Sequence, residues 1–409
     1  MAYTKTTTKS YSSRLGDSLK GILFGIILFI GGTVLLFYNE GRAVKTEAAI
    51  SEAQENVVEA TDISNIDPAL NGKLIHASGR AETKDILTDP TFNIQTTAIK
   101  LRRTLYYYQW EEESRSETRE NAGGSMETTT TYTYKKVWSG TPIDSTQFEN
   151  PKYRDRNFQL LNLKSEEWLA PHVTFGAYTL PTFLKNAILG EDPVAVSMTD
   201  QQRHDWQTRL AKSFTARQRP DASSEKEDAP QNEVPTLLHI TDNTIYFGKS
   251  DVDPQIGDMK VIFTKVVPAQ VSILANVSGT TFEKYRAQNG ETFSRLEMDT
   301  VSAEVMFKNA HRENMILTWV LRAVGTLLIV IGLRVAFSIV SMIFKWFPLL
   351  GNIIEAGVGI VCFVGGIIWS LLVIASAWII YRPVLAITLI GIAIAALIWL
   401  ALRGKKASA

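Results

Sequence analysis

An uncharged apolar run from Gly21 to Tyr38 constrains this chain more than any other feature. A helix needs about 20 such residues to cross a hydrocarbon core of about 30 Å. A cleavable signal sequence has a shorter apolar region, of roughly 7 to 15 residues, followed by small residues. Here the run is followed by Asn39-Glu40-Gly41-Arg42 instead. Residues 21–38 therefore predict a retained membrane anchor, with Tyr38 at the interface.

Three further apolar runs lie near the C-terminal end of the sequence. Residues 315–334 carry only Arg322 and the terminal Arg334 as charges, and residues 357–380 and 384–402 carry none. The short Tyr381-Arg382-Pro383 connection between the last two runs suits an antiparallel pair of helices. The sequence thus predicts four transmembrane helices.

Residues 335–356 are also apolar but are interrupted by Lys345, Pro348 and Gly351. The segment could extend the second transmembrane helix or lie flat among the head groups, with Trp346 and Phe347 in the interface. We expect the interfacial arrangement on the cytoplasmic side.

Basic residues beside the apolar runs predict the orientation, because Lys and Arg are enriched in cytoplasmic loops. The short loop after the third run carries Arg382 alone. On the opposite side lie Lys5, Lys9, Arg14, Lys20, Arg334, Lys345, Arg403, Lys405 and Lys406. The tails 1–20 and 403–409 are therefore expected in the cytoplasm, and residues 39–314 on the extracytoplasmic or lumenal side.

Residues 39–314 predict a β-rich α+β domain. Short β-type runs separated by turn signals are typical of a small sandwich or barrel, and an OB-like barrel is one candidate. Residues 95–110 and 128–138 predict a long hairpin with a polar tip. Helices are expected at 43–60, 199–214 and 300–309, and further strands at 73–77, 237–247, 259–267 and 271–277.

Composition excludes several classes of function. The chain has 42 basic and 42 acidic residues, which argues against a nucleic-acid binder with its usual basic surplus. A single cysteine, Cys362, permits no intrachain disulfide and no cysteine-based metal site. The five histidines are scattered, and Asp251 to Asp258 lacks the spacing of a calcium loop. We therefore expect no metal, no cofactor and no catalytic residues.

Arg322 is the first candidate site residue, because a charge inside the membrane is costly and usually functional. It could line an ion or lipid pathway, or it could have a structural role or reach the head groups. Arg334 and Glu355 are both expected near the inner boundary, where they could pair. Gly21 and Gly25 form a G-x-x-x-G pattern that permits close helix packing within the chain or between copies.

Tyr106, Tyr107, Tyr108 and Trp110 form an aromatic cluster in the predicted hairpin. Such a cluster on an exposed strand would suit contacts with a partner protein. The alternative is a strand that packs into the core of the domain.

The order of several short motifs resembles the LUMA family, also called the transmembrane protein 43 family. In the extracytoplasmic part the motifs are Tyr38 to Arg42, Tyr108 to Glu112 and Gly257 to Val261. The likeness is strongest in the C-terminal part, at Thr318 to Gly325, Lys345 to Pro348 and Ala377 to Pro383. It covers nearly the whole chain, and it fades at 113–130 and 217–235.

This resemblance implies an integral membrane protein without a recognised catalytic centre. Eukaryotic members reside in the endoplasmic reticulum and inner nuclear membrane, self-associate and are linked to lamina complexes. A bacterial member would occupy the inner membrane. We therefore expect a non-enzymatic scaffold that forms homo-oligomers and contacts membrane lipids and other membrane proteins. A channel or channel-regulating subunit is the alternative.

Overall fold

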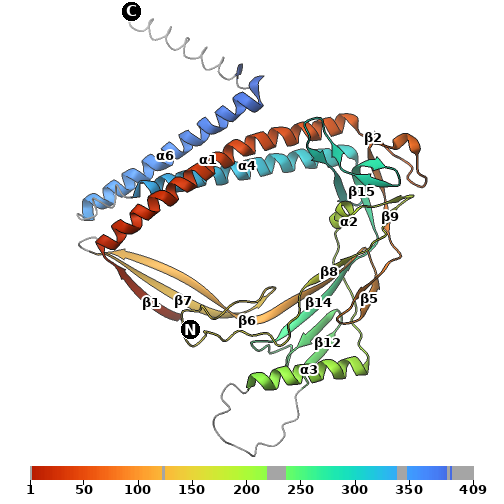
Figure 1. The fold of residues 1–409 in the computed structure, drawn as a ribbon, viewed down its shortest axis with the longest axis horizontal. Helices are drawn as coiled ribbons and strands as arrows, with labels where there is room; N and C mark the ends of the chain where they lie inside the picture. Colours follow the sequence, from red (N-terminus) through yellow and green to blue (C-terminus); the bar gives the residue numbers. More distant parts are fainter. Residues whose placement is uncertain (1, 122–124, 219–235, 339–347, 385–386, 389–409) are drawn as a thin grey trace, which may run out of the picture.

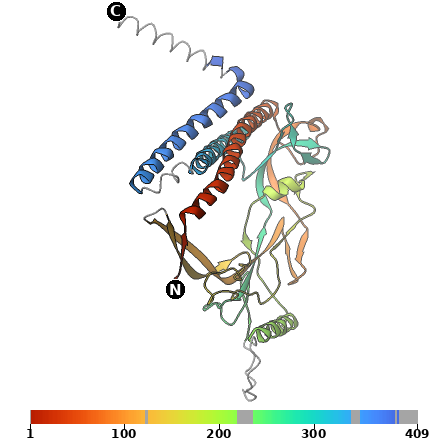
Figure 2. The same ribbon diagram turned by 60° about the vertical axis from the view of Figure 1, so that its left-hand side comes forward.

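The computed structural model describes residues 2–121, 125–218, 236–338, 348–384 and 387–388. Three long helices form one side of the molecule: α1 (Tyr11–Asn56), α4 (Ala303–Ala336) and α6 (Pro348–Tyr381). Figure 1 shows α1 and α4 side by side, and Figure 2 shows α6 on the side of this pair away from the β-rich region. Each helix contains a stretch long and apolar enough to cross a membrane.

These helices confirm the predicted helical character of residues 21–38, 315–334 and 357–380. The predicted fourth helix, 384–402, lies almost wholly outside the described residues. Leucines, isoleucines and aromatic residues are exposed along all three helices, as expected of surfaces that face lipid. They include Leu23, Phe24, Ile27, Ile30, Val34, Ile316, Trp319, Val320, Leu327, Ile360, Val361, Leu371, Leu372 and Ile380.

The region between α1 and α4 contains a closed five-stranded barrel. Its strands are β3 (Leu74–Glu82), β9 (Thr174–Phe175), β10 (Tyr178–Thr179), β15 (Ala269–Ser278) and β16 (Thr281–Glu283). The ring runs β3-β9-β10-β16-β15 and closes where β15 pairs with β3. Within the ring, only β10 and β16 are parallel. The short strands β2 (Val58–Glu59) and β19 (Arg295–Met298) extend this sheet, and the 3-10 helix η1 (Pro68–Leu70) precedes β3.

A second, eight-stranded sheet is built from segments inserted between barrel strands and from β1, which precedes α1. Its order is β1-β7-β6-β14-β13-β12, with β8 on β6 and β11 on β14. The bounds of these strands are β1 (Ala2–Lys9), β6 (Lys100–Glu120), β7 (Met126–Ser139), β8 (Glu166–Leu169), β11 (Asp192–Pro193), β12 (Leu238–Thr241), β13 (Thr244–Phe247) and β14 (Met259–Val266). The predicted long hairpin is thus β6 and β7, which Figure 1 shows extending back toward the start of α1.

The remaining elements are short. Helix α2 (Thr182–Ala187) joins β10 of the barrel to β11 of the second sheet. Helix α3 (Asp200–Gln218) lies between β11 and β12 and confirms the helix predicted near 199–214. Two small ribbons pair β4 (Ile86–Asp89) with β5 (Ile94–Thr97), and β17 (Tyr285–Arg286) with β18 (Thr292–Phe293).

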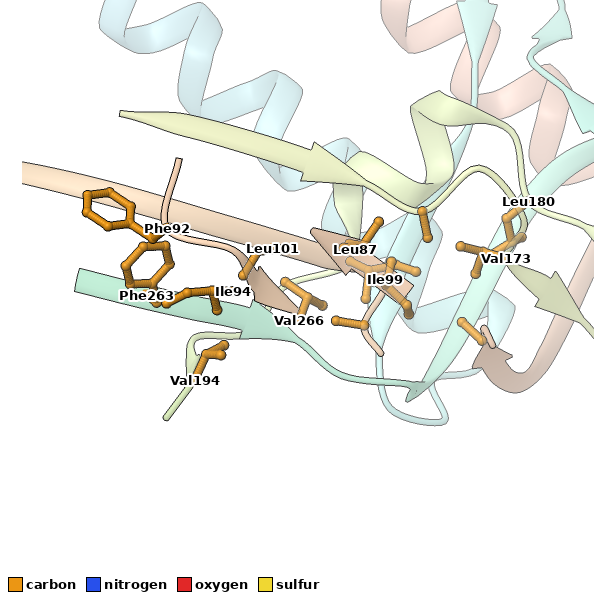
Figure 3. Packing of buried hydrophobic residues seen from close by; sticks show 14 of the residues in the cluster. Leu87, Phe92, Ile94, Ile99, Leu101, Val173, Leu180, Val194, Phe263 and Val266 are labelled. Atoms are coloured by element: carbon orange, nitrogen blue, oxygen red, sulfur yellow. The ribbon is translucent and has the colours of Figure 1, made fainter. Parts of the chain in front are cut away.

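One hydrophobic core joins the barrel to the second sheet. Alternate residues of β6 and β14, such as Leu101 and Phe263, point inward and pack against Phe92. Figure 3 shows this packing continuing through Ile99 and Val266 toward Val173 and Leu180 near the barrel. The two sheets therefore form one α+β unit.

The structure describes two membrane-adjacent segments in part. Residues 1–20 were expected to form a cytoplasmic tail; Ala2–Lys9 pairs with β7, and α1 begins at Tyr11. Threonine favours extended structure, and here a threonine-rich strand meets the threonine-rich part of β7. Residues 335–356 were expected to lie flat in the interface; α4 continues to Ala336 and α6 begins at Pro348, and residues 339–347 lie outside the described residues. Proline is well tolerated in the first turn of a helix. The cytoplasmic side of the first segment and the interfacial placement of the second therefore stay predictions.

Candidate functional site at the junction of the helices

A buried ion pair joins α1 to α4. Arg322 donates from Nε to Oε1 of Glu40 at 2.6 Å, and from Nη2 to Oε2 at 2.8 Å. The Glu40 side chain is fully buried, and that of Arg322 is 14% exposed. Two parallel hydrogen bonds of this kind are the strongest geometry available to an arginine and a carboxylate.

The third helix contributes two aromatic rings to the same pair. Trp378 of α6 donates from Nε1 to Oε2 of Glu40 at 2.8 Å. The guanidinium of Arg322 lies 4.8 Å from the ring centroid of Trp319 and 5.8 Å from that of Trp378. Glu40 is thus bonded to α4 and α6 at once, and the charge of Arg322 is covered by two indoles.

Polar side chains continue this contact along the α1–α4 seam. Asn39 donates to the backbone carbonyl of Thr318 at 3.1 Å. Arg42 donates to Oδ1 of Asn314 and to Oγ1 of Thr318, both at 3.1 Å. Its buried Nε has no acceptor among the described residues. We call Asn39, Glu40, Arg42, Asn314, Thr318, Arg322 and Trp378 the junction network.

Gly41 leaves room for the Tyr381 ring at the end of α6. A Cβ built on Gly41 would lie 2.7 Å from this ring. A side chain at position 41 would therefore have to displace the Tyr381 ring.

Beyond the junction network, α1 and α4 continue outward and the barrel docks on them. His311 of α4 contacts Glu47 of α1 at 2.9 Å. Tyr285 donates to Glu52 at 2.8 Å, and Arg295 of β19 pairs with Glu313 of α4 at 2.7 Å. These contacts fix the barrel to the two helices that also enter the membrane.

A groove of about 800 Å³ runs along this outer part of the α1–α4 seam. Arg322 and Arg382 lie among its lining residues, and Lys308, His311 and Arg312 also line it. Glu47 is the sole acid among the described lining residues. The groove is therefore basic.

The structure gives the predicted membrane residues different places. Arg322 belongs to the junction network. Gly25 packs within the chain, because a Cβ on it would lie 2.6 Å from the backbone nitrogen of Ala336, and Gly21 faces Val335 of α4 more loosely. Arg334 lies in α4 and Glu355 in α6, but the Glu355 side chain lies outside the described part, so their pairing stays a prediction.

The aromatic cluster of the hairpin divides between the two faces of the sheet. Tyr107 is buried in the core and donates to the carbonyl of Leu163 at 2.8 Å. Tyr106 and Tyr108 lie half-buried on the opposite face, where Lys260 and Trp138 contact them. Trp110 packs edge to face against Tyr153 under the loop that follows the hairpin. Of the four aromatic residues, Tyr107 is buried, whereas Tyr106, Tyr108 and Trp110 are half-buried.

Glu40 is the site residue that sequence reasoning missed. In the sequence, Glu40 follows the end of an apolar run, whereas in the structure α1 continues through Glu40. The available signal was the combination of an acid at the end of one apolar run with an arginine inside another.

No group of three or more His, Cys, Asp or Glu side chains in the described ranges could hold a metal ion. The carboxylate of Glu40 accepts three hydrogen bonds from Arg322 and Trp378, and its side chain is fully buried.

Comparison with known proteins identifies the family. The profile described as "Transmembrane protein 43" matches residues 107–383. The chain belongs to the transmembrane protein 43 family. Human transmembrane protein 43 is 27% identical over 393 residues, which cover 95% of this chain and 92% of the human protein. The Drosophila melanogaster homolog is 28% identical and covers 92% of this chain and 93% of its own length. No solved structure matches significantly.

Three of the segments that resemble the family meet in the junction network. Tyr38 to Arg42, Thr318 to Gly325 and Ala377 to Pro383 are far apart in the chain, yet they supply Glu40, Arg322 and Trp378. A second resembling segment has its own steric reason: Gly257 has φ +96°, and a Cβ there would overlap the Phe158 ring. The Lys345 to Phe347 part lies outside the described residues.

Proposed function

We propose that this member of the transmembrane protein 43 family is a non-enzymatic membrane scaffold that holds its barrel in a fixed position on the bilayer surface. The observation that carries the proposal is the hydrogen bonding of buried Glu40 by Arg322 and Trp378, which ties the three long helices α1, α4 and α6 together. A buried charge with all its partners in place stabilises one arrangement. Such a buried pair does not provide the weak ion-binding sites that ion conduction needs.

The scaffold is expected to self-associate and to organise lipids or other membrane proteins. Glycines that the intrachain contacts do not use support self-association. A Cβ on Gly31, Gly357, Gly359 or Gly365 would meet nothing within 4 Å, so these positions are available for close packing with another helix. Half-exposed Tyr106 and Tyr108 are candidate contacts for a protein partner.

We infer that the barrel is OB-like and extracytoplasmic, with both termini in the cytoplasm. The strand order supports the first point, because numbering the barrel strands along the chain gives the ring 1-2-3-5-4 with strands 3 and 5 parallel. The distribution of Lys and Arg supports the second. The membrane would be a bacterial inner membrane or, in a eukaryote, the endoplasmic reticulum or inner nuclear membrane.

A channel or channel-regulating subunit is the second candidate. It is favoured by one observation, that Arg322 lines a polar groove of about 800 Å³ at the edge of the apolar region. An arginine facing such a space could repel cations or attract anions.

Reconstitution separates the two candidates. The full chain and its Arg322→Leu variant would be placed in planar bilayers for conductance recording, and their oligomer sizes compared in detergent. We expect no conductance from either protein, and a loss of stable oligomers in the variant because the helix packing is disturbed. Conductance in the wild type that changes with Arg322→Leu would instead establish the channel.

A further inference from the structure

The basic groove on the α1–α4 seam has more positive charge than its own partners neutralise. Arg322 is paired with Glu40, and His311 contacts Glu47. The remaining cations of the lining, Lys308, Arg312 and Arg382, form no ion pair with any described residue. Arg312 donates to the Asn309 amide, which is neutral.

These three cations lie at the two ends of one groove. Lys308 and Arg312 precede the apolar part of α4, whereas Arg382 directly follows α6 and lines the groove together with Arg322. From Lys308 to Arg322 the helix rises by about 20 Å at 1.5 Å per residue. The groove therefore extends from the barrel side of the seam to the edge of the apolar surface.

Apolar side chains line the same groove. Met315 is 55% exposed and Trp319 is 63% exposed, and both line it beside Thr318. Tryptophan is enriched at the boundary between hydrocarbon and head groups. A ligand in this groove would contact both the cations and the apolar side chains of Met315 and Trp319.

We infer that this groove binds an anionic phospholipid, whose negatively charged phosphate is attracted by Arg382, Lys308 and Arg312. Arginine and lysine are the usual ligands of phosphate oxygens, and the apolar part of the lipid would lie against Trp319 and Met315. The inference specifies the lipid class that the proposed scaffold organises, and it rests on the membrane placement of that proposal. A soluble phosphate would use the same cations, so the test must separate the two sources.

The test is lipid retention by the purified full-length chain in detergent. Phosphatidylglycerol or phosphatidylcholine is added, and native mass spectrometry and the shift in unfolding temperature report binding. Three variants are compared: Arg382→Gln and the control Lys84→Gln each remove one positive charge, and the double variant Lys308→Gln with Arg312→Gln removes two. Lys84 is exposed in the loop after β3 and does not line the groove.

We expect phosphatidylglycerol to be retained and to stabilise the chain, and phosphatidylcholine to do neither. Removing each cation should weaken retention by about fivefold, because a basic residue near an anionic lipid surface contributes about that factor. Lys84→Gln should bind like the wild type. Both groove variants change exposed or half-exposed residues, and their unfolding temperature without lipid checks that they fold.

Three results would overturn the inference. Equal retention of phosphatidylglycerol and phosphatidylcholine would show that the negative charge of the lipid has no role. If Lys84→Gln lost as much phosphatidylglycerol as Arg382→Gln, the effect would come from the net charge of the protein and not from the groove. Displacement of the lipid by glycerol phosphate at similar concentration would assign the groove to a soluble phosphate. None of these results depends on conductance or oligomer size, so the scaffold proposal and this inference fail separately.

Discussion

Gly25 of α1 and Gly332 of α4 face each other so closely that a Cβ built on either would lie 2.7 Å from the other's carbonyl oxygen. The same relationship recurs at Gly32, where a Cβ would lie 2.7 Å from the carbonyl oxygen of Gly325. Close backbone approach of this kind lets two membrane helices gain van der Waals contact without a large side chain between them. The helices α1 and α4 are therefore held together by close backbone packing inside the apolar region and by hydrogen bonds and an ion pair at its edge.

The first prediction compares two glycine substitutions. Gly25→Ala should destabilise the chain by about 1–3 kcal/mol, because the added methyl meets backbone atoms that cannot turn aside. Gly365→Ala should leave stability unchanged, since its Cβ would have open space. Unfolding of the two variants in the same detergent measures the difference. If Gly365→Ala instead reduces oligomer size, the unused glycines of α6 belong to a contact between copies.

The second prediction concerns the ion pair between Glu40 and Arg322. Glu40→Gln and Arg322→Met should each cost about 3–5 kcal/mol, because each leaves the other group buried without its partner. The double variant Glu40→Gln with Arg322→Met should be less destabilised than the sum of the single changes.

The matched control for the ion pair is Arg102→Gln. Arg102 pairs with Glu167 on the surface of the second sheet, where the two side chains are 38% and 39% exposed. An exposed pair contributes about 1 kcal/mol or less. Denaturant unfolding of all four proteins gives the comparison, and strict additivity in the double variant would show that the pair is not coupled.

The third prediction tests the membrane orientation through β1 and β7. The hydroxyls of Thr6 and Thr129 lie 3.4 Å apart, so cysteines at both positions are placed to form a disulfide. If α1 spans the bilayer, residues 2–9 and the hairpin lie on opposite sides of it. A polar hairpin cannot cross hydrocarbon in contact with lipid, so the paired and the membrane-spanning arrangements exclude each other.

We therefore expect no Thr6→Cys to Thr129→Cys cross-link in native membranes. The control is Ser116→Cys with Thr130→Cys, whose hydroxyls lie 2.9 Å apart within the hairpin and which should cross-link in either arrangement. Both pairs are made in a Cys362→Ala background and read by mobility on non-reducing gels. Efficient cross-linking of the first pair in sealed membranes would place both ends of the apolar run 21–38 on the same side.

The fourth prediction concerns the buried carboxyl of Asp258. Burial raises its pKa above the ordinary value, although Tyr246 and the Gln255 backbone both donate to it. The folded state then binds a proton more tightly than the unfolded state. Stability should therefore fall as the pH rises from the unfolded pKa through the folded pKa.

Asp258→Asn should remove that pH dependence, because an amide keeps an acceptor for Tyr246 but does not titrate. Unfolding temperatures measured from acidic to neutral pH would show a flatter profile for the variant across this window. A profile parallel to that of the wild type would mean that another group causes the dependence.

The sequence was sufficient for elements that depend on local pattern. The apolar runs 21–38, 315–334 and 357–380 predicted helices because a helix forms all its backbone hydrogen bonds within a single segment, as a segment in hydrocarbon requires. The β-branched and aromatic stretch from Gln95 to Trp110 predicted a strand, and its threonine-rich partner predicted the hairpin. The closed barrel was one of the alternatives that short, regularly spaced strands allow.

Long-range relationships were not available from the sequence. Glu40 and Arg322 are separated by 282 positions, and no local signal pairs an acid with one particular arginine at that distance. The same holds for the barrel, whose second and third strands are two residues each and are separated from the first and fourth by long insertions. Strand β1 was missed because a short segment of threonine and lysine is equally common in a solvated tail.

The distance between Glu40 and Arg322 along the chain also has a consequence for biosynthesis. A ribosome releases α1 long before it reaches α4, so the carboxylate enters the translocation machinery with neither its arginine nor its indole partner. Until α4 and α6 are synthesised, Glu40 of α1 lacks its hydrogen-bond donors, so its charge is more stable in water at the mouth of the translocon than in the apolar interior of the membrane. A chain truncated before Arg322 would lack both residues that donate to the Glu40 carboxylate, so this acid would stay without its partners.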